Sequence, residues 1–248
     1  MKKKILIALL LVMTIICSSF SVSAASFESE SSQFTTSGAA EATEEQVQRG
    51  NSVKKADIST ANRTEAEAYA TIDPNSRATS WLYTTRYFYY YGQETNYSCG
   101  AACVKMALRN ITGTTYSEAA VRTGCNTTST AGTYLVDMVE YINEEQDYNF
   151  YVERYRQTKA SMQEDLYEGI TYWDAPPIIG VRETTANGWN YNLSAHFVII
   201  YAVTSSQSTF AVTDPWSGYI GDNANRDISV SVNDLYTAYN AVNIGYMY

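Results

Sequence analysis

The sequence of 248 residues contains only one histidine, His196, and it has no excess of basic residues. Its 17 lysines and arginines are outnumbered by 26 aspartates and glutamates, which gives a formal net charge of −9. A surface this acidic repels phosphate backbones, so we expect no nucleic acid partner. Because there is one histidine, any mechanism that needs an imidazole base depends on His196.

Long apolar runs are also scarce, since only one occurs, from Ile5 to Ile16. Three lysines precede this run and small residues follow it. A basic start, an apolar core that is short for a bilayer span, and small residues together predict a secretory signal peptide over 1–24, cleaved near Ala24 or Ala25. We therefore expect a secreted, extracellular protein without a membrane anchor. Processing leaves 14 basic and 26 acidic side chains, a net charge of −12.

Cysteine is scarce as well, because only Cys99, Cys103 and Cys125 lie beyond the signal peptide. An odd number in an exported protein leaves at least one thiol unpaired. If a disulfide forms, the pair Cys103 and Cys125 is favoured, because a bond between residues one helical turn apart has poor geometry. The alternative is that Cys103 is buried and free. Catalysis is one reason for an exported protein to keep a free thiol.

Large apolar residues are rare between about Ser26 and Ser80, where Ser, Thr, Ala and Glu dominate. Such a stretch cannot bury enough surface to offset chain entropy, so residues 25–80 are predicted to form a disordered linker or a pro-segment, with the flexible tether favoured. At Trp81 the composition becomes aromatic. We place one folded domain over 81–248, which is long enough for a sizeable core.

Apolar periodicity predicts helices in the first part of this domain and mainly strands in the second. The predicted helices lie at 99–110, 117–123, 133–145, 161–168 and 233–239. The predicted strands lie at 150–154, 177–182, 195–203 and 209–213, with a last strand from Val242. Helices followed by a mainly antiparallel sheet indicate an α+β fold.

Cys99 has the surroundings of a nucleophile. A free thiol is mostly protonated at neutral pH, and a catalytic cysteine therefore needs help to become a thiolate. Cys99 lies at the predicted start of a helix, where unpaired N–H groups and the helix dipole favour an anion. Gly100 follows it and was expected to leave room for a substrate backbone beside the sulfur. The structural alternative is a buried cysteine that behaves as a small hydrophobic residue.

His196 and Asp214 complete the predicted catalytic group. His196 is the only residue that can accept a proton as an imidazole base and return it to the leaving group. Asp214 ends the strand that follows the one opened by His196, so a hairpin of the two strands would bring them together and allow Asp214 to orient the ring. The alternatives are a histidine packed in the core and an Asp-Pro pair that only starts a turn.

Gln93 lies six residues before Cys99 and could donate its side-chain amide to an oxyanion beside the backbone N–H of Cys99. A zinc site built from the three cysteines and His196 is disfavoured, because the Cys-x3-Cys spacing is unusual for zinc. No spaced Asp/Asn loop demands calcium. We therefore expect neither a metal nor another cofactor.

The segments Gln93 to Met106, Ala195 to Ile199 and Thr213 to Trp216 together resemble the papain-like cysteine peptidases. Among these, the chain is most similar to the bacterial peptidases that process bacteriocin leaders after a double glycine, and to their free-standing secreted relatives. The resemblance implies a papain-like fold, with a helical half that carries the nucleophile and a sheet half that carries His and Asp. It also implies the roles of nucleophile for Cys99, base for His196, orienting acid for Asp214 and oxyanion donor for Gln93.

Three functions are compatible with these residues. The first is a secreted cysteine peptidase, acting on a peptide or protein substrate through a thioester acyl-enzyme. The second is a catalytically idle papain-like domain that binds peptides or proteins. The third is an acyl transferase with the same triad, because hydrolysis and transfer share their first half-reaction. A monomer is expected, and the sequence gives no bond preference.

Overall fold

The computed structural model describes residues 34–53, 80–147 and 151–248. The predicted signal peptide and residues 54–79 of the predicted linker lie outside the described residues. In these three ranges, no helix combines the length and the apolar character needed to cross a bilayer.

Helices and strands follow one another largely in the predicted order. The helices are α2 (Glu44–Ser52), α4 (Cys99–Thr112), α5 (Glu118–Gly124), α6 (Leu135–Glu144), α7 (Lys159–Thr171), α8 (Trp216–Tyr219) and α9 (Val232–Asn240). The strands are β1 (Trp81–Tyr83), β2 (Glu153–Arg154), β3 (Ile178–Glu183), β4 (Leu193–Thr204), β5 (Thr209–Thr213), β6 (Asp227–Ser231) and β7 (Tyr246–Met247). The predicted α+β class is confirmed, with the cysteine-bearing helices ahead of an antiparallel sheet.

Within the described residues the sheet has seven strands, in the order β2-β7-β3-β4-β5-β6, and β1 pairs with the far end of β4. These strands pair with one another in antiparallel fashion. The 12-residue strand β4 is central and pairs with both β3 and β5. Because neighbouring strands run in opposite directions, the end of β3, the start of β4 and the end of β5 meet at the same end of the sheet.

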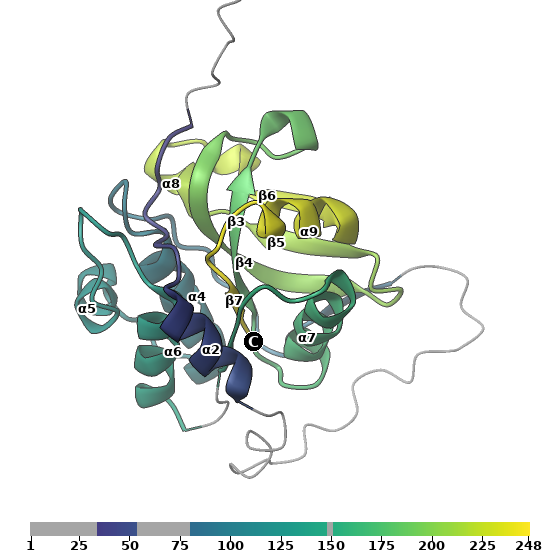
Figure 1. The fold of residues 1–248 in the computed structure, drawn as a ribbon, viewed down its shortest axis with the longest axis horizontal. Coiled ribbons are helices and arrows are strands. Elements are labelled where there is room, and N and C mark those ends of the chain that lie inside the picture. The colour runs from purple at the N-terminus through teal and green to yellow at the C-terminus, as the bar shows by residue number, and fades with distance from the viewer. Residues whose placement is uncertain (1–33, 54–79, 148–150) are drawn as a thin grey trace, which may run out of the picture. The chain divides into compact units, whose positions relative to one another are not determined.

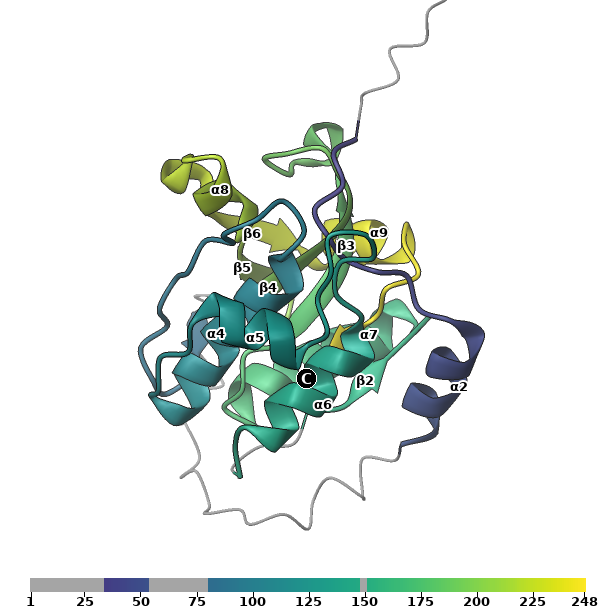
Figure 2. The ribbon, with the colours of Figure 1, turned by 90° about the vertical axis from the view of Figure 1, so that its left-hand side faces the viewer.

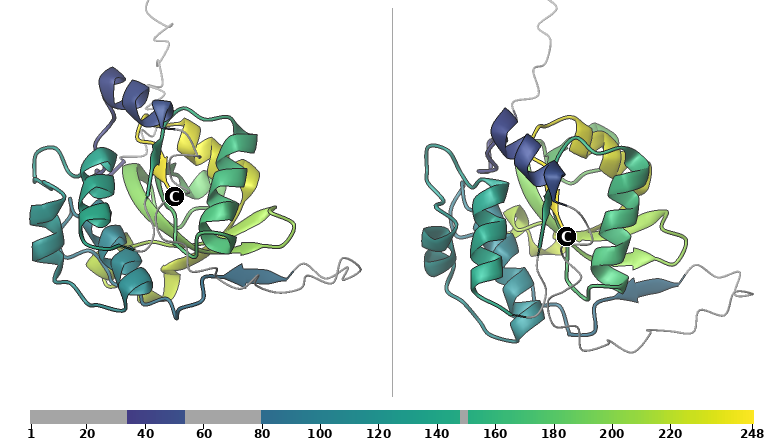
Figure 3. Two further views of the ribbon diagram at one scale, coloured as in Figure 1. Left: turned by 90° about the horizontal axis from the view of Figure 1, so that it is seen from below. Right: turned by 60° about the horizontal axis from the view of Figure 1, so that its bottom comes forward.

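Helices cover both faces of the sheet, with α4, α5 and α6 on one face and α7 and α9 on the other (Figures 1 and 3). Successive side chains of β4 point to opposite faces of the sheet, so this strand contributes to the core on each face. Phe197 and Ile199 pack in the core formed with α4 and α6, whereas Val198 and Ile200 pack in the core formed with α7 and α9. The continuous apolar run of β4 follows from this burial on both faces.

Helix α4 is the element that presents the predicted nucleophile. It starts at Cys99 and ends at Thr112, where Gly113 adopts a left-handed φ of 75° and caps the last turn. Its first turns are built from small residues, including Ala101 and Ala102, which are fully buried. Small side chains allow the helix axis to lie close to β4, so the start of α4 and the start of β4 approach each other.

Residues 34–53 differ from the sequence prediction of a disordered linker. They include α2, whose first turn is closed by a capping box between Thr43 and Gln46, and whose Val47 is buried in the core beside α4 and α6. Figure 2 shows this segment, in purple, passing beside β3 and β4 before it reaches α2. The segment is held mainly by backbone hydrogen bonds, which need no apolar periodicity, so composition gave no sign of its order.

Candidate active site

Cys99 is the first residue of α4 and is fully buried. No side chain caps this end of the helix, so the amides of its first turn keep their preference for a negative charge. The backbone N–H of Phe197 on β4 donates to the Cys99 sulfur over 3.4 Å. The helix start and the strand amide thus both direct N–H groups toward the Cys99 sulfur.

Cys103 and Cys125 have the opposite surroundings. All three described cysteines are free, so the favoured Cys103 and Cys125 disulfide is absent from the structure. Burial raises the pKa of both thiols, well above the usual range for Cys103, where the neighbouring Cys99 adds to the effect. Cys103 lies one turn beyond Cys99 and its thiol donates to the carbonyl of Phe197 over 3.4 Å. Burial therefore keeps both of these thiols protonated at neutral pH.

His196 lies near the start of β4 and is fully buried. Its Nε2 lies 2.6 Å from Oδ1 of Asp214, and its Nδ1 lies 2.7 Å from the hydroxyl oxygen of Ser37. That hydroxyl also lies 2.8 Å from the carbonyl of Ala195, to which it can donate its single hydrogen. In the protonated form of the ring both nitrogens donate, Nε2 to Asp214 and Nδ1 to Ser37.

The charges around His196 agree with this protonation. Burial by itself would lower the pKa of His196, but its interactions with Asp214 and then with Cys99 raise it. The net pKa lies well above the usual value. The ring therefore stands as an imidazolium between a carboxylate and the cysteine.

Asp214 follows the last residue of β5, and the hairpin of β4 and β5 brings it to His196. The backbone N–H of Trp216 donates to the same oxygen, Oδ1, over 2.8 Å. The hydroxyls of Tyr90 and Ser217 donate to the carbonyl of Asp214. These bonds fix the carboxylate in one orientation, so the ring that it holds is fixed too.

Gln93 is buried in the loop before α4. Its backbone N–H donates to the carbonyl of Pro215 over 3.0 Å, which ties this loop to the residue after Asp214. Its side-chain nitrogen donates to the carbonyl of Thr95 over 2.6 Å. The amide nitrogen carries two hydrogens, so one of them remains for another acceptor.

Gly100 has a different role from the one expected. A Cβ at this position would lie 2.8 Å from the Cβ of Thr133 and 2.9 Å from the sulfur of Met138. The missing side chain therefore makes room for the loop before α6, and the expectation that it opens space for a substrate was wrong. Glycine is needed here for packing inside the helical half.

Two residues of the site escaped the sequence analysis, Ser37 and Glu183. Ser37 belongs to a segment rich in Ser and Thr, where nothing distinguishes it from its neighbours. Glu183 ends β3 and is fully buried, and neither of its carboxyl oxygens has a hydrogen-bond partner among the described residues. The sequence feature that could have indicated Glu183 is its position, as an acidic residue directly after the predicted apolar strand 177–182.

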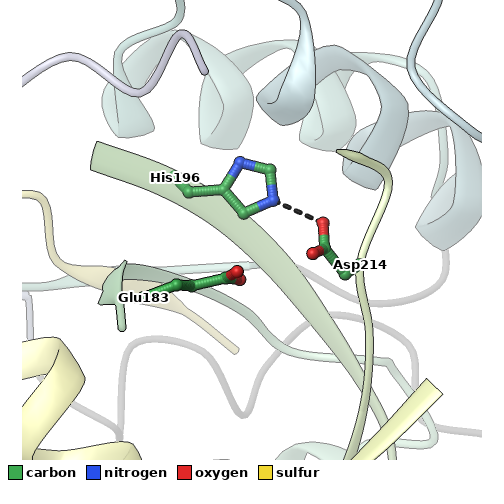
Figure 4. Close-up of side chains that lie close together, drawn as sticks. All are labelled: Glu183, His196 and Asp214. Carbon is green, nitrogen blue, oxygen red and sulfur yellow. Dashed lines mark hydrogen bonds and ion pairs between the residues drawn. The ribbon is translucent and has the colours of Figure 1, made fainter. Parts of the chain in front are cut away.

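Glu183 points toward the space between His196 and Asp214 (Figure 4). Each of these three side chains has one nitrogen or oxygen atom that could bind a metal ion, and these three atoms lie within 4.8 Å of one another. Burial, reinforced by Asp214, raises the pKa of Glu183 well above its usual range, although His196 opposes the shift. Two carboxyls and an imidazole are also the donor types that a cation would use. The raised pKa of Glu183 favours the neutral form of its carboxyl.

The arrangement is suited to acyl transfer through a thiol. The Cys99 sulfur, at a helix start, lies beside an imidazolium whose far nitrogen is held by a carboxylate. The start of α4 supplies backbone N–H donors, and Gln93 supplies an amide donor in the adjoining loop.

The model of the Peptidase C39 family matches residues 87–242. No curated protein matches the chain.

Solved structures also resemble the chain. A double glycine motif protease from an AMS/PCAT transporter, crystallised with its leader peptide, shares 18% identity with a TM-score of 0.44, over 68% of this chain and 96% of that one. The peptidase domain of Streptococcus ComA, a bifunctional ABC transporter of a quorum sensing pathway, shares 17% identity with a TM-score of 0.44, over 65% and 97%. The bromelain protease of Ananas comosus, bound to the E64 inhibitor, shares 13% identity with a TM-score of 0.40, over 65% and 93%.

Proposed function

The chain belongs to the peptidase C39 family and is a cysteine peptidase of papain-like fold, and on this premise we propose that it hydrolyses peptide bonds with Cys99, His196, Asp214 and Gln93. The observation that carries the proposal is that the two nitrogens of the His196 ring have different partners. Because Nε2 is bound to Asp214, only Nδ1 can exchange a proton with Cys99 or with the leaving group.

In the first half-reaction the Cys99 thiolate attacks the carbonyl carbon of the scissile bond. The negative charge moves to the carbonyl oxygen, where the backbone N–H of Cys99 and the side-chain amide of Gln93 stabilise it. His196 then gives its Nδ1 proton to the leaving nitrogen as the C–N bond breaks. An amine leaves, a thioester remains on Cys99, and the imidazole is neutral.

In the second half-reaction water attacks the thioester. Neutral Nδ1 of His196 accepts a proton from the water while its oxygen bonds to the acyl carbon. The C–S bond breaks, the carboxylic acid leaves, and the thiolate and imidazolium pair is restored. Asp214 keeps the ring in place through both steps and stabilises its positive charge.

The proposed substrate is a peptide or protein, and the proposed location is outside the cell. Support for export comes from the signal-peptide pattern of residues 1–24. Recovery of the protein from the culture medium with an N-terminus at Ala25 or Ser26 would support it. A protein retained with Met1 intact would contradict it.

Peptide hydrolysis is tested by incubating the protein with a peptide library and identifying the new termini by mass spectrometry. Addition of a primary amine separates hydrolysis from transfer, because transfer yields an amide product of higher mass. Cleavage that survives in Cys99→Ala would contradict the proposal.

A further inference from the structure

The two residues that must meet the substrate are closed off from solvent. Cys99 and His196 are both fully buried, and so is Ser37, which lies against the His196 ring. A scissile carbonyl cannot reach the sulfur while this cover is in place. The cover is the N-terminal segment of the same chain, residues 35–40.

On the sheet side, the segment pairs with the start of β4. Thr35 forms a parallel bridge with Leu193, in which its N–H donates to Asn192 over 3.2 Å and its carbonyl accepts from Ser194 over 3.1 Å. Two residues later, the Ser37 hydroxyl donates to the carbonyl of Ala195, the residue before His196. These bonds align the segment along the strand that carries the imidazole.

On the helical side, the segment pairs with the loop before α6. Ala39 forms a parallel bridge with Thr133, with the Thr133 N–H donating to Gly38 over 2.7 Å and the Ala40 N–H donating to Thr133 over 2.9 Å. The segment is thus an extended peptide held by backbone hydrogen bonds from both halves of the fold. This is the manner in which a groove binds a peptide.

Gly38 makes a close contact with the loop before α4. Its φ of +99° is disfavoured for other residues, and a Cβ there would lie 2.1 Å from the carbonyl oxygen of Tyr97. Tyr97 is two residues before Cys99. The segment therefore passes the loop just before Cys99 with almost no clearance at Tyr97.

Ser37 occupies the position where the chemistry takes place. Nδ1 of His196 is the ring nitrogen left for proton exchange, and in this structure it is hydrogen-bonded to the Ser37 hydroxyl over 2.7 Å. A leaving group needs the same N–H. Ser37 and a substrate therefore exclude each other at His196.

Helix α2 anchors the segment on its far side. The side chain of Asn51 exchanges two hydrogen bonds with the backbone of Tyr155, of 2.9 and 3.0 Å, and Arg154 donates to the carbonyl of Gly50 over 2.9 Å. Val47 adds an apolar contact with the core. The cover is therefore fixed at both ends.

We infer that residues 35–40 are an intramolecular inhibitor that occupies the peptide-binding groove, so that the chain in this conformation is a latent peptidase. The inference rests on the proposed function for its catalytic meaning, although the occupancy of the groove can be measured without it. Removal of the segment opens the groove between Thr133 and residues 192–195, where the backbone of a substrate binds in its place.

The test uses the full chain with Gly38→Ala, which forces the segment away from Tyr97. The matched control is Gly188→Ala, because Gly188 also has a left-handed φ, of +81°, but a Cβ there meets nothing within 4 Å. The first readout is the rate at which iodoacetamide modifies Cys99 at mildly acidic pH, with peptide mapping to separate Cys99 from the other two cysteines. The second readout is hydrolysis of a peptide substrate.

We expect Gly38→Ala to increase the rate of Cys99 alkylation at least about tenfold, with Gly188→Ala unchanged. Ser37→Ala, which removes the bond to His196 without a clash, should increase it in the same direction by about tenfold. The thermal midpoint of each variant shows that it remains folded. Fast alkylation in the unmodified chain, or no change in either folded segment variant, would overturn the inference.

The two readouts distinguish a failure of the inhibitor inference from a failure of the proposed function. If alkylation of Cys99 rises in Gly38→Ala but no variant hydrolyses peptides, the segment covers the groove and the proposed function is wrong. If the unmodified chain hydrolyses peptides as fast as Gly38→Ala, the proposed function is supported and the inhibitor is excluded.

Discussion

Nε2 of His196 lies 2.6 Å from Oδ1 of Asp214, although the two residues are 18 positions apart in the chain. The hairpin of β4 and β5 produces this contact, because Thr213 at the end of β5 pairs with Ile199, three residues after His196 on β4. The carboxylate is held in turn by the Trp216 N–H. The pair fixes which nitrogen of the ring is free to act.

Asp214→Asn tests this relationship. We expect kcat/KM for a peptide substrate to fall about 10²-fold to 10⁴-fold, because an amide orients the ring poorly and cannot stabilise its charge. The pKa of His196 should fall as well, since Asp214 is the main group that raises it. The only histidine in the chain gives a single imidazole signal, so its NMR titration measures that pKa directly. The exposed Asp227→Asn is the control, and an equal pKa in both variants would contradict the assignment.

Cys99→Ala and Cys103→Ala compare two buried cysteines one turn apart on α4. Loss of Cys99 should reduce kcat about 10⁴-fold or more, because no other group can form the thioester. Loss of Cys103 should leave kcat within about threefold and cost about 1 kcal/mol of unfolding free energy, since its thiol only packs and donates to Phe197. Steady-state kinetics and chemical denaturation measure the two effects. Comparable losses of kcat would argue against a unique nucleophile.

Gln93→Ala should lower kcat about 10²-fold to 10³-fold with little change in KM, because an oxyanion donor acts mainly in the transition state. Gln163→Ala is the matched control, since Gln163 also donates its amide to a backbone carbonyl, that of Gln207, but on α7. A rise in KM at constant kcat for Gln93→Ala would instead indicate a role in ground-state binding.

Glu183→Gln tests the buried carboxyl through the pH dependence of stability. Burial raises the pKa of Glu183, so between about pH 4.5 and the raised pKa the folded state holds a proton that the unfolded state has lost. The free energy of unfolding therefore falls as pH rises across this window, by at most about 1.4 kcal/mol per pH unit. Glu183→Gln removes this dependence and becomes progressively more stable than the unmodified chain from pH 5 to pH 8.

Urea denaturation at several pH values measures this difference. The control is Glu164→Gln, on the exposed side of α7, which should follow the unmodified chain at every pH. A stability difference for Glu183→Gln that does not grow with pH would show that Glu183 is ionised in the folded protein.

Local sequence patterns predicted much of the fold. The helix that opens at Cys99 and the hairpin of β4 and β5 each depend on periodicity within a few turns or one short connection. The α+β class follows from their order. Strand β6 was missed, because Asp227–Ser231 has polar residues at most positions and only Val230 is deeply buried.

The candidate site residues were predictable where the sequence offered few alternatives for a role. One histidine left one possible base, and helix position separated Cys99 from the cysteine one turn later. Glu183 was not foreseen because an acidic residue after a strand is common at surfaces, and its burial depends on how β3 and β4 pair around it.

The sequence alone determined the chemistry available to this protein: a thiol at a helix start, one imidazole, and an acid one strand later. Only the tertiary structure decided that Ser37, 159 positions from His196, lies against its free nitrogen and closes the site. The physical reason is that residues 35–40 are held by backbone N–H and carbonyl groups, which almost every residue carries. Contacts of this kind leave no trace in composition or periodicity, so the position of Ser37 beside His196 becomes visible only in three dimensions.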